Sequence, residues 1–99
     1  MAFRIIWTET AANDLHTIVR YIAMDNREVA RRVAEKLLHR IDDAALFPFA
    51  GRMVPEKEDP SLRELLLNPY RIIYTVDESR QALYVVRIWH AARGTPAID

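Results

Sequence analysis

Basic side chains gather near the end of the chain, where an apolar run stops. Between Ser79 and Ile98 the sequence has three arginines and one histidine, and it has no carboxylate. Of these basic residues, His90 and Arg93 follow the apolar run "YVVRIW". A guanidinium binds phosphates and carboxylates through paired hydrogen bonds, and an imidazole exchanges its proton near neutral pH. The composition therefore indicates a surface for an anionic partner or a site of acid–base chemistry.

The strands that must position these residues are predicted from β-branched and aromatic runs. The predicted strands are Phe3–Trp7, Leu62–Leu67, Tyr70–Val76 and Gln81–Ala91. Turn-forming residues separate the last three strands, at positions 68–69 and 77–80. Short connections of this kind join antiparallel neighbours, so these three strands are expected to form a meander. The stretch 47–60 before them has no hydrophobic period and is predicted to be a loop.

Two amphipathic helices are predicted between the first strand and the meander. Apolar residues recur at helical spacing over positions 11–22 and again over 30–45. Thr8 offers a side-chain cap for the first helix, and Pro48 ends the second. The expected order is strand, helix, helix, strand, strand, strand. We therefore expect a two-layer α+β fold, in which a helical hairpin packs on one face of a mostly antiparallel sheet.

Length and composition narrow the class of protein. The 99 residues allow a single domain, covering residues 1–99. The chain has no cysteine and hence no thiolate ligand, and we expect no metal ion and no cofactor. Its 14 basic and 14 acidic residues cancel, which argues against general binding to nucleic acid. No apolar run approaches the roughly 20 residues of a membrane helix, and the first residues do not form a signal peptide, so we expect a cytoplasmic protein.

The turn between the last two predicted strands decides which side chains share a face of the sheet. It has an even number of residues, so Val76 is expected opposite Gln81, and opposed residues share a face. The more apolar face then carries Tyr70, Ile72, Tyr74, Val76, Leu83, Val85, Arg87 and Trp89. We expect this face to pack against the helical residues Leu15, Ile18, Ile22, Val33, Leu37 and Ile41.

The opposite face of the predicted sheet carries Arg71 and His90 beside an apolar group. That group consists of Ile73, Tyr84, Val86 and Ile88. Soluble proteins rarely leave so large an apolar patch in contact with water. A partner chain is therefore expected to cover this face.

Four segments carry a resemblance to a known family. They are "AANDLHTIVRYI", "FPFAGRMVPE", "LRELLLNPYRIIYTV" and "LYVVRIWHAAR". In this order and spacing they resemble the ParE/RelE toxin superfamily of type II toxin–antitoxin systems, the plasmid stabilisation toxins. The resemblance covers residues 5–93, and its most specific motifs are Pro48-x-x-Gly51-Arg52, Arg63-Glu64-Leu65, Tyr70-Arg71-Ile72-Ile73-Tyr74 and His90-x-x-Arg93.

The resemblance implies a partner and a mode of regulation. Toxins of this superfamily are neutralised by a small antitoxin that wraps the toxin, and the complex represses its own operon. A cognate antitoxin is therefore the expected cover of the apolar face with Ile73, Tyr84, Val86 and Ile88. Contact with DNA is expected only through the DNA-binding part of the antitoxin.

The resemblance leaves more than one function open. RelE-like members are ribosome-dependent mRNA endonucleases, whose chemistry needs a base, an acid and cations at the phosphate. In such a nuclease Arg71 would hold the phosphate and His90 would act as the acid. The base would be Glu56 or Glu58 in the predicted loop. Against a nuclease, that loop has one lysine, Ala91 follows His90, and the net charge is zero.

ParE-like members inhibit DNA gyrase by binding and have no hydrolytic chemistry. The His90-x-x-Arg93 ending is more similar to these members, so we expect a binding inhibitor of DNA gyrase. The residues expected to contact the target are Arg63, Arg71, His90 and Arg93. A third possibility is a toxin fold without toxicity, which serves only as the partner of the antitoxin in autoregulation.

Overall fold

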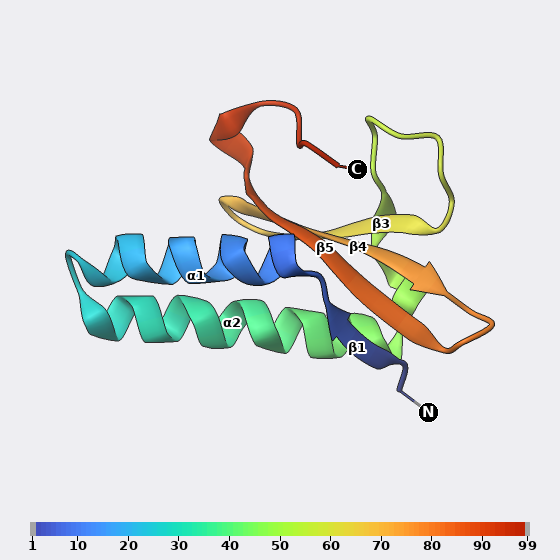
Figure 1. The fold of residues 1–99 in the computed structure, drawn as a ribbon, viewed down its shortest axis with the longest axis horizontal. Helices are drawn as coiled ribbons and strands as arrows, with labels where there is room; N and C mark the ends of the chain where they lie inside the picture. The colour runs from blue at the N-terminus through green and yellow to red at the C-terminus, as the bar shows by residue number, and fades with distance from the viewer. Residues whose placement is uncertain (1, 99) are drawn as a thin grey trace.

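A five-stranded sheet packs against a hairpin of two helices in the computed structural model, which describes residues 2–98 (Figure 1). The helices are α1 (Glu9–Ala23) and α2 (Arg27–Leu46), and the short 3-10 helices are η1 (Pro48–Ala50) and η2 (Ala91–Arg93). The strands are β1 (Arg4–Trp7), β2 (Arg52–Met53), β3 (Leu62–Leu67), β4 (Tyr70–Asp77) and β5 (Ala82–His90). The predicted two-layer α+β fold is confirmed.

The strands lie in the order β1-β5-β4-β3-β2 across the sheet. β1 runs parallel to β5, and the other neighbours are antiparallel. The predicted meander of β3, β4 and β5 is confirmed, whereas β2 lies inside the stretch that we predicted to be a loop. A strand of two residues is too short for a hydrophobic period, so only its pairing with β3 identifies it.

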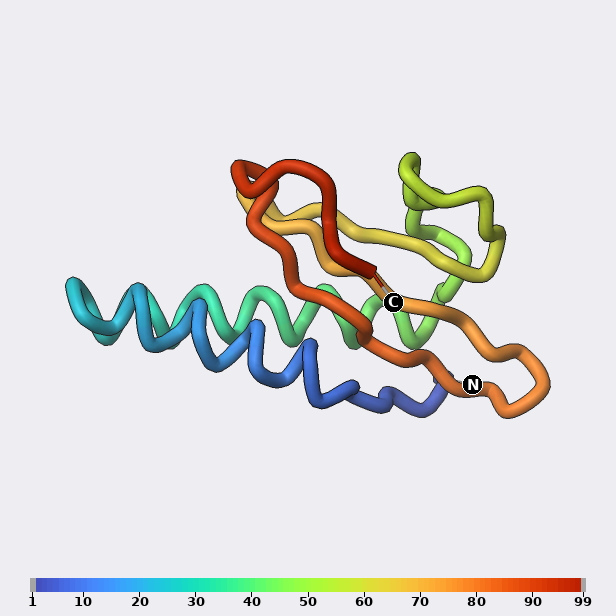
Figure 2. Tube along the Cα trace, turned by 45° about the horizontal axis from the view of Figure 1, so that its top comes forward, coloured from blue at the N-terminus to red at the C-terminus, as the bar shows by residue number. Residues whose placement is uncertain are grey.

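The first helix begins where the sequence predicts, and the second begins at Arg27, three residues before its apolar period. The Thr8 hydroxyl accepts a hydrogen bond from the Ala11 amide at 3.1 Å. The Asn26 side chain accepts one from the Val29 amide at 3.1 Å. These caps satisfy amide groups that have no partner inside their own helix. The joined end of the two helices projects beyond the sheet (Figures 1 and 2).

Near the turn between β4 and β5, the predicted faces are correct although the predicted register is wrong. Val76 lies opposite Leu83 and not opposite Gln81. Side chains of a strand alternate between the two faces, so a shift of two residues leaves each side chain on its predicted face.

A β-bulge reverses the faces in the second half of β5. Tyr74 pairs with Val85, but Ile73 pairs with Arg87, so Val86 is the extra residue of the bulge. An extra residue moves every following side chain of the strand to the opposite face. The alternation that the sequence predicts for β5 therefore holds only up to the bulge.

The bulge corrects four of our placements. Arg87 and Trp89 do not lie on the helix-side face, and Ile88 and His90 do not lie on the far face, which is the face opposite the helices. Ile88 belongs to the helix-side core and His90 pairs with Tyr70, whereas Trp89 packs with Ile73 on the far face.

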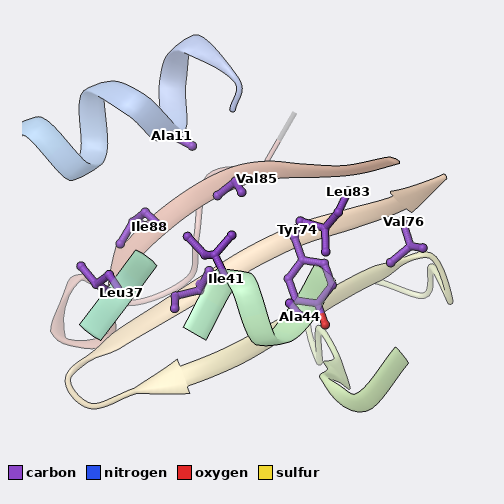
Figure 3. Close-up of a cluster of buried hydrophobic side chains, with 10 residues drawn as sticks. Ala11, Leu37, Ile41, Ala44, Tyr74, Val76, Leu83, Val85 and Ile88 are labelled. Carbon is purple, nitrogen blue, oxygen red and sulfur yellow. The ribbon is translucent and has the colours of Figure 1, made fainter. Parts of the chain in front are cut away.

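The helix-side core joins both layers (Figure 3). Its buried members are Ala11, Leu37, Ile41, Ala44, Ile72, Tyr74, Val76, Leu83, Val85 and Ile88. Leu15, Ile18 and Val33 pack against this cluster, as predicted. Ile22 does not, because it lies in the projecting part of α1 and lines a hollow at the hairpin tip.

The far face of the sheet has an apolar cluster of its own. The buried members are Val54, Leu62, Ile73 and Trp89. Val54 is the first residue of the loop 54–61, and Leu62 directly follows its last residue. Ile98, near the C-terminus, packs against the same cluster. Tyr84 and Val86 are half-buried. The chain itself therefore covers much of the face for which we expected a partner.

Candidate functional site

Arg71 lies in a cluster of ion pairs on the far face of the sheet, in which Arg71 and Glu64 are buried and Arg52 and Glu56 are exposed. Its Nε donates to Glu64 at 2.6 Å, and its two Nη atoms donate to Glu56 at 2.9 and 2.7 Å. Arg52 Nε donates to the other oxygen of Glu64 at 2.5 Å. Glu64 is 1% exposed and Arg71 is 9% exposed. Glu56 belongs to the loop 54–61, so the cluster ties this loop to the sheet.

The charges of this cluster balance. Arg52 and Arg71 face Glu56 and Glu64. Hydrogen bonds from Arg71 hold the pKa of Glu56 below its usual range. The hydrogen bonds to Glu56 raise the pKa of Arg71, although burial acts in the opposite direction. All three guanidinium nitrogens of Arg71 donate within the chain, so this group is engaged by the fold.

Arg63 is also engaged by the fold. Its Nε donates to the carbonyl of Pro60 at 2.8 Å. Its Nη1 donates to the carbonyls of Gly51 at 3.2 Å and Phe49 at 3.4 Å. The guanidinium also lies 4.9 Å from the centroid of the Phe49 ring. Arg63 therefore fastens the segment between η1 and the start of β3.

His90 and Arg93 instead lie at a groove between α1 and the adjoining ends of β4 and β5, which we call the α1–β5 groove. Its volume is about 570 Å³. The lining residues are Asp14, Thr17, Ile18, Tyr21, Tyr70, Arg87, Ile88, His90 and Arg93. The groove combines aromatic and aliphatic side chains with basic groups, so it suits a polypeptide segment that carries both apolar and acidic side chains.

Trp89 holds Arg93 in place beside the groove. The Arg93 guanidinium lies 4.2 Å from the centroid of the indole ring, within the range of a cation–π contact. The indole is itself fixed, because its Nε1 donates to the carbonyl of Gly94 at 3.0 Å. Arg93 is exposed and takes part in none of the salt bridges within residues 2–98. Its charge is therefore fixed in position and open to a partner.

His90 is oriented by its two neighbours. Its Nδ1 accepts a hydrogen bond from the Ala92 amide at 3.1 Å and so caps η2. With Nδ1 as acceptor, the neutral imidazole carries its proton on Nε2. The Tyr70 ring packs edge-on against the imidazole, with 5.4 Å between the ring centroids. The bulge in β5 is what turns His90 toward this side of the sheet.

Asp14 of α1 neutralises the second arginine at the groove. Arg87 Nε and Nη2 donate to the two carboxylate oxygens of Asp14, both at 2.8 Å. The Ile88 amide donates to the same carboxylate at 3.0 Å. The two side chains are 16% and 12% exposed, so solvent screens this ion pair only weakly. The pair fastens α1 to β5. Among the residues that the structure describes, no carboxylate forms a salt bridge with Arg93, the other arginine of the lining.

The structure identifies two further candidate binding residues, Tyr21 and Met24, which the sequence analysis did not name. Tyr21 is 77% exposed and Met24 is 86% exposed. Tyr21 lines the α1–β5 groove and also, with Met24, a second hollow of about 530 Å³ at the hairpin tip. The sequence carried a signal for them, since both are large residues outside the apolar stripe of positions 11–22.

The three residues of the nuclease interpretation are not brought together. Glu56 and Arg71 are hydrogen-bonded, but Arg71 pairs with Trp89 while His90 pairs with Tyr70, so the Arg71 and His90 side chains point to opposite faces. Within residues 2–98 no group of three or more His, Cys, Asp or Glu side chains could hold a metal ion. In the same part of the chain no helix combines the length and the apolar character that a membrane crossing requires.

Two comparisons of sequence give concordant results. The family model described as ParE toxin of type II toxin-antitoxin system, parDE, matches residues 5–94. Toxin RelE2 of Caulobacter vibrioides is 36% identical to this chain over 91 residues, which are 91% of this chain and 97% of that protein.

Solved structures share the fold. The chromosomal ParDE system from P. aeruginosa aligns with a TM-score of 0.71 and 23% identity, over 90% of this chain and 96% of that chain. The toxin–antitoxin complex RelBE2 from Mycobacterium tuberculosis aligns with a TM-score of 0.65 and 18% identity, over 91% and 99%. A mutant of E. coli toxin RelE in the free state aligns with a TM-score of 0.63 and 17% identity, over 95% and 88%.

Proposed function

The chain belongs to the ParE/RelE toxin superfamily of type II toxin–antitoxin systems, and on this basis we propose that it is a ParE-like toxin that inhibits its target by binding. The observation that carries the proposal is the separation of Arg71 and His90 on opposite faces of the sheet. Cleavage of RNA needs an acid, a base and a cation around one phosphate. Inhibition by binding needs no such convergence and is compatible with an Arg71 that is engaged by Glu56 and Glu64.

Neutralisation by a cognate antitoxin is part of this proposal. The fold is shared with the ParDE system of P. aeruginosa and with the RelBE2 toxin–antitoxin complex of M. tuberculosis. Exposed apolar side chains at the end of α2 and around β2 and β3 offer a contact surface, namely Leu46, Phe47, Phe49, Met53 and Leu66. The net charge of zero favours contact with operator DNA only through the antitoxin.

We propose DNA gyrase in the cytoplasm as the target, with His90 and Arg93 as contact residues. The target follows from the resemblance of the His90-x-x-Arg93 ending to ParE-like toxins. Arg93 supports the contact because Trp89 holds its exposed charge in a defined position. Fixed charges of this kind set the orientation and the association rate of a protein complex.

Substituting His90→Gln distinguishes binding from catalysis. Glutamine keeps a polar side chain of similar reach but exchanges no proton near neutral pH. A nuclease that uses His90 as its acid would lose about 10²–10⁴ in rate, and a binding inhibitor would lose far less. The measurements are inhibition of DNA supercoiling by gyrase and ribosome-dependent cleavage of mRNA, each with purified wild type and variant. Cleavage of mRNA that collapses in His90→Gln would overturn the proposal in favour of the nuclease.

A further inference from the structure

One flank of α1 presents a strip of side chains that runs from the α1–β5 groove to the hairpin tip. The strip consists of Asp14, Thr17 and Tyr21 of α1 and of Met24, the C-cap residue of that helix. Their spacing of three to four residues keeps them on one side of the helix. The groove and the hollow at the tip, of about 570 and 530 Å³, share Tyr21 and therefore adjoin. We call this surface the α1 strip.

The apolar end of the α1 strip is uncovered. Tyr21 and Met24 are 77% and 86% exposed, and both line the hollow at the end of the hairpin where α1 joins α2. This end of the hairpin projects beyond the sheet (Figure 2). Exposure of two large neighbouring side chains is unfavourable in water. Aromatic residues and methionine are enriched at protein–protein interfaces, where their large apolar area is buried.

The α1 strip also has a charge at each end. At the β5 end the charge of Arg87 is neutralised by Asp14 at 2.8 Å, and Arg93 adds an exposed guanidinium fixed by Trp89 at 4.2 Å. At the other end, Asp25 lines the tip hollow, and the C-terminus of α1 carries the negative end of the helix dipole. A complementary partner therefore places a carboxylate at Arg93, apolar side chains at Tyr21 and Met24, and no carboxylate at the tip.

We propose that the α1 strip binds an amphipathic helical segment of the toxin's target protein. The segment places apolar side chains against Tyr21 and Met24 and a carboxylate against Arg93. A helix that binds along a groove presents its contact residues at three- and four-residue spacing. Thr17, Tyr21 and Met24 of the α1 strip follow the same spacing. At a rise of about 1.5 Å per residue, the ten steps from Asp14 to Met24 span about 15 Å, or about three turns of a partner helix.

This inference rests on the proposed function and is tested with Tyr21→Ala and Met24→Ala. Leu38→Ala is the matched control, because it also removes an exposed apolar side chain, 43% exposed, but from α2. Exposed positions contribute little to stability, so all three variants should fold and unfold like wild type. We expect Tyr21→Ala to weaken binding to purified DNA gyrase at least about tenfold, with a smaller loss for Met24→Ala and none for Leu38→Ala.

Growth arrest and affinity for the cognate antitoxin of the same operon are measured on the same variants. We expect growth arrest to weaken most in Tyr21→Ala, less in Met24→Ala and not in Leu38→Ala, as for gyrase binding. Affinity for the antitoxin should stay unchanged in all three variants. Wild-type arrest in Tyr21→Ala and Met24→Ala, or a loss confined to antitoxin binding or to self-association, would overturn the inference. If the wild-type protein arrests growth but does not bind gyrase, the proposed function is contradicted and not this inference. In that case, growth arrest by the two variants still decides whether the α1 strip contacts the target.

Discussion

At the scale of single residues, two arginines that were both predicted to contact the target have different environments. Arg71 is buried beside Glu64 and is also paired with the exposed Glu56, and these charged hydrogen bonds offset the cost of removing its charge from water. Arg93 keeps its hydration and is held through the face of the Trp89 ring. Arg71 is therefore expected to matter chiefly for stability, and Arg93 chiefly for binding.

Arg93→Ala should abolish growth arrest while the protein remains folded. An exposed charge and a cation–π contact together contribute about 1 kcal/mol or less to stability. The free energy of unfolding, measured in urea, should therefore fall by no more than about 1 kcal/mol. Arg80→Ala is the control, since Arg80 is an exposed arginine in the turn between β4 and β5, paired with Asp77. Equal arrest by both variants would show that the position of Arg93 is irrelevant.

Glu56 should make stability depend on pH. Hydrogen bonds from Arg71 lower its folded-state pKa below the ordinary 4.5, so Glu56 stabilises the fold above that value. The contribution is lost as the pH falls through the folded pKa, because the unfolded chain takes up the proton first. The free energy of unfolding of Glu56→Gln should therefore fall less steeply than that of wild type below pH 4.5.

Urea unfolding at a series of acidic pH values measures the slope of the free energy of unfolding against pH. Glu58→Gln is the control, because Glu58 is an exposed glutamate in the same loop. We expect it to keep the slope of wild type. A slope in Glu56→Gln that equals wild type would mean that the ion pair with Arg71 contributes nothing in solution.

At the scale of elements, Thr8 links the first helix to the sheet. Its hydroxyl accepts from the Ala11 amide at 3.1 Å and donates to the Val85 carbonyl at 2.8 Å. Thr8→Ala removes both contacts and should cost about 1–2 kcal/mol in the free energy of unfolding, whereas Thr8→Ser should restore most of it. Urea unfolding of the three proteins provides the comparison. Identical stability of the alanine and serine variants would show that the cap is not what holds α1.

At the scale of the whole molecule, Asp14 and Arg87 join the helical layer to the edge of the sheet across 73 positions in the sequence. Asp14→Asn leaves the largely buried Arg87 without its counter-charge and should cost about 3 kcal/mol. Glu35→Gln, which weakens an exposed ion pair with Arg31 on α2, should cost much less. Chemical denaturation measures both changes. Similar costs for the two variants would contradict a role of Asp14 in holding the layers together.

The sequence by itself determined the two helices, the four longer strands and their order, but not β2. Caps, prolines and apolar periods act over a few neighbouring residues, so Thr8 and Pro48 marked the start of α1 and the end of α2 correctly. The same local patterns, in this order, pointed to the toxin superfamily. They also predicted that His90 and Arg93 lie outside the core, at the end of the last strand.

Only the tertiary structure decided which face each of the late residues occupies. The bulge at Val86 depends on how β4 pairs with β5, and it exchanged the faces of Trp89 and His90. The burial of Arg71 depends on Glu56, which is 15 positions away in the sequence and reaches it only because the loop folds over the sheet. Strand register and ion pairs between distant segments follow from the packing of the whole chain, and no local pattern of residue types specifies them.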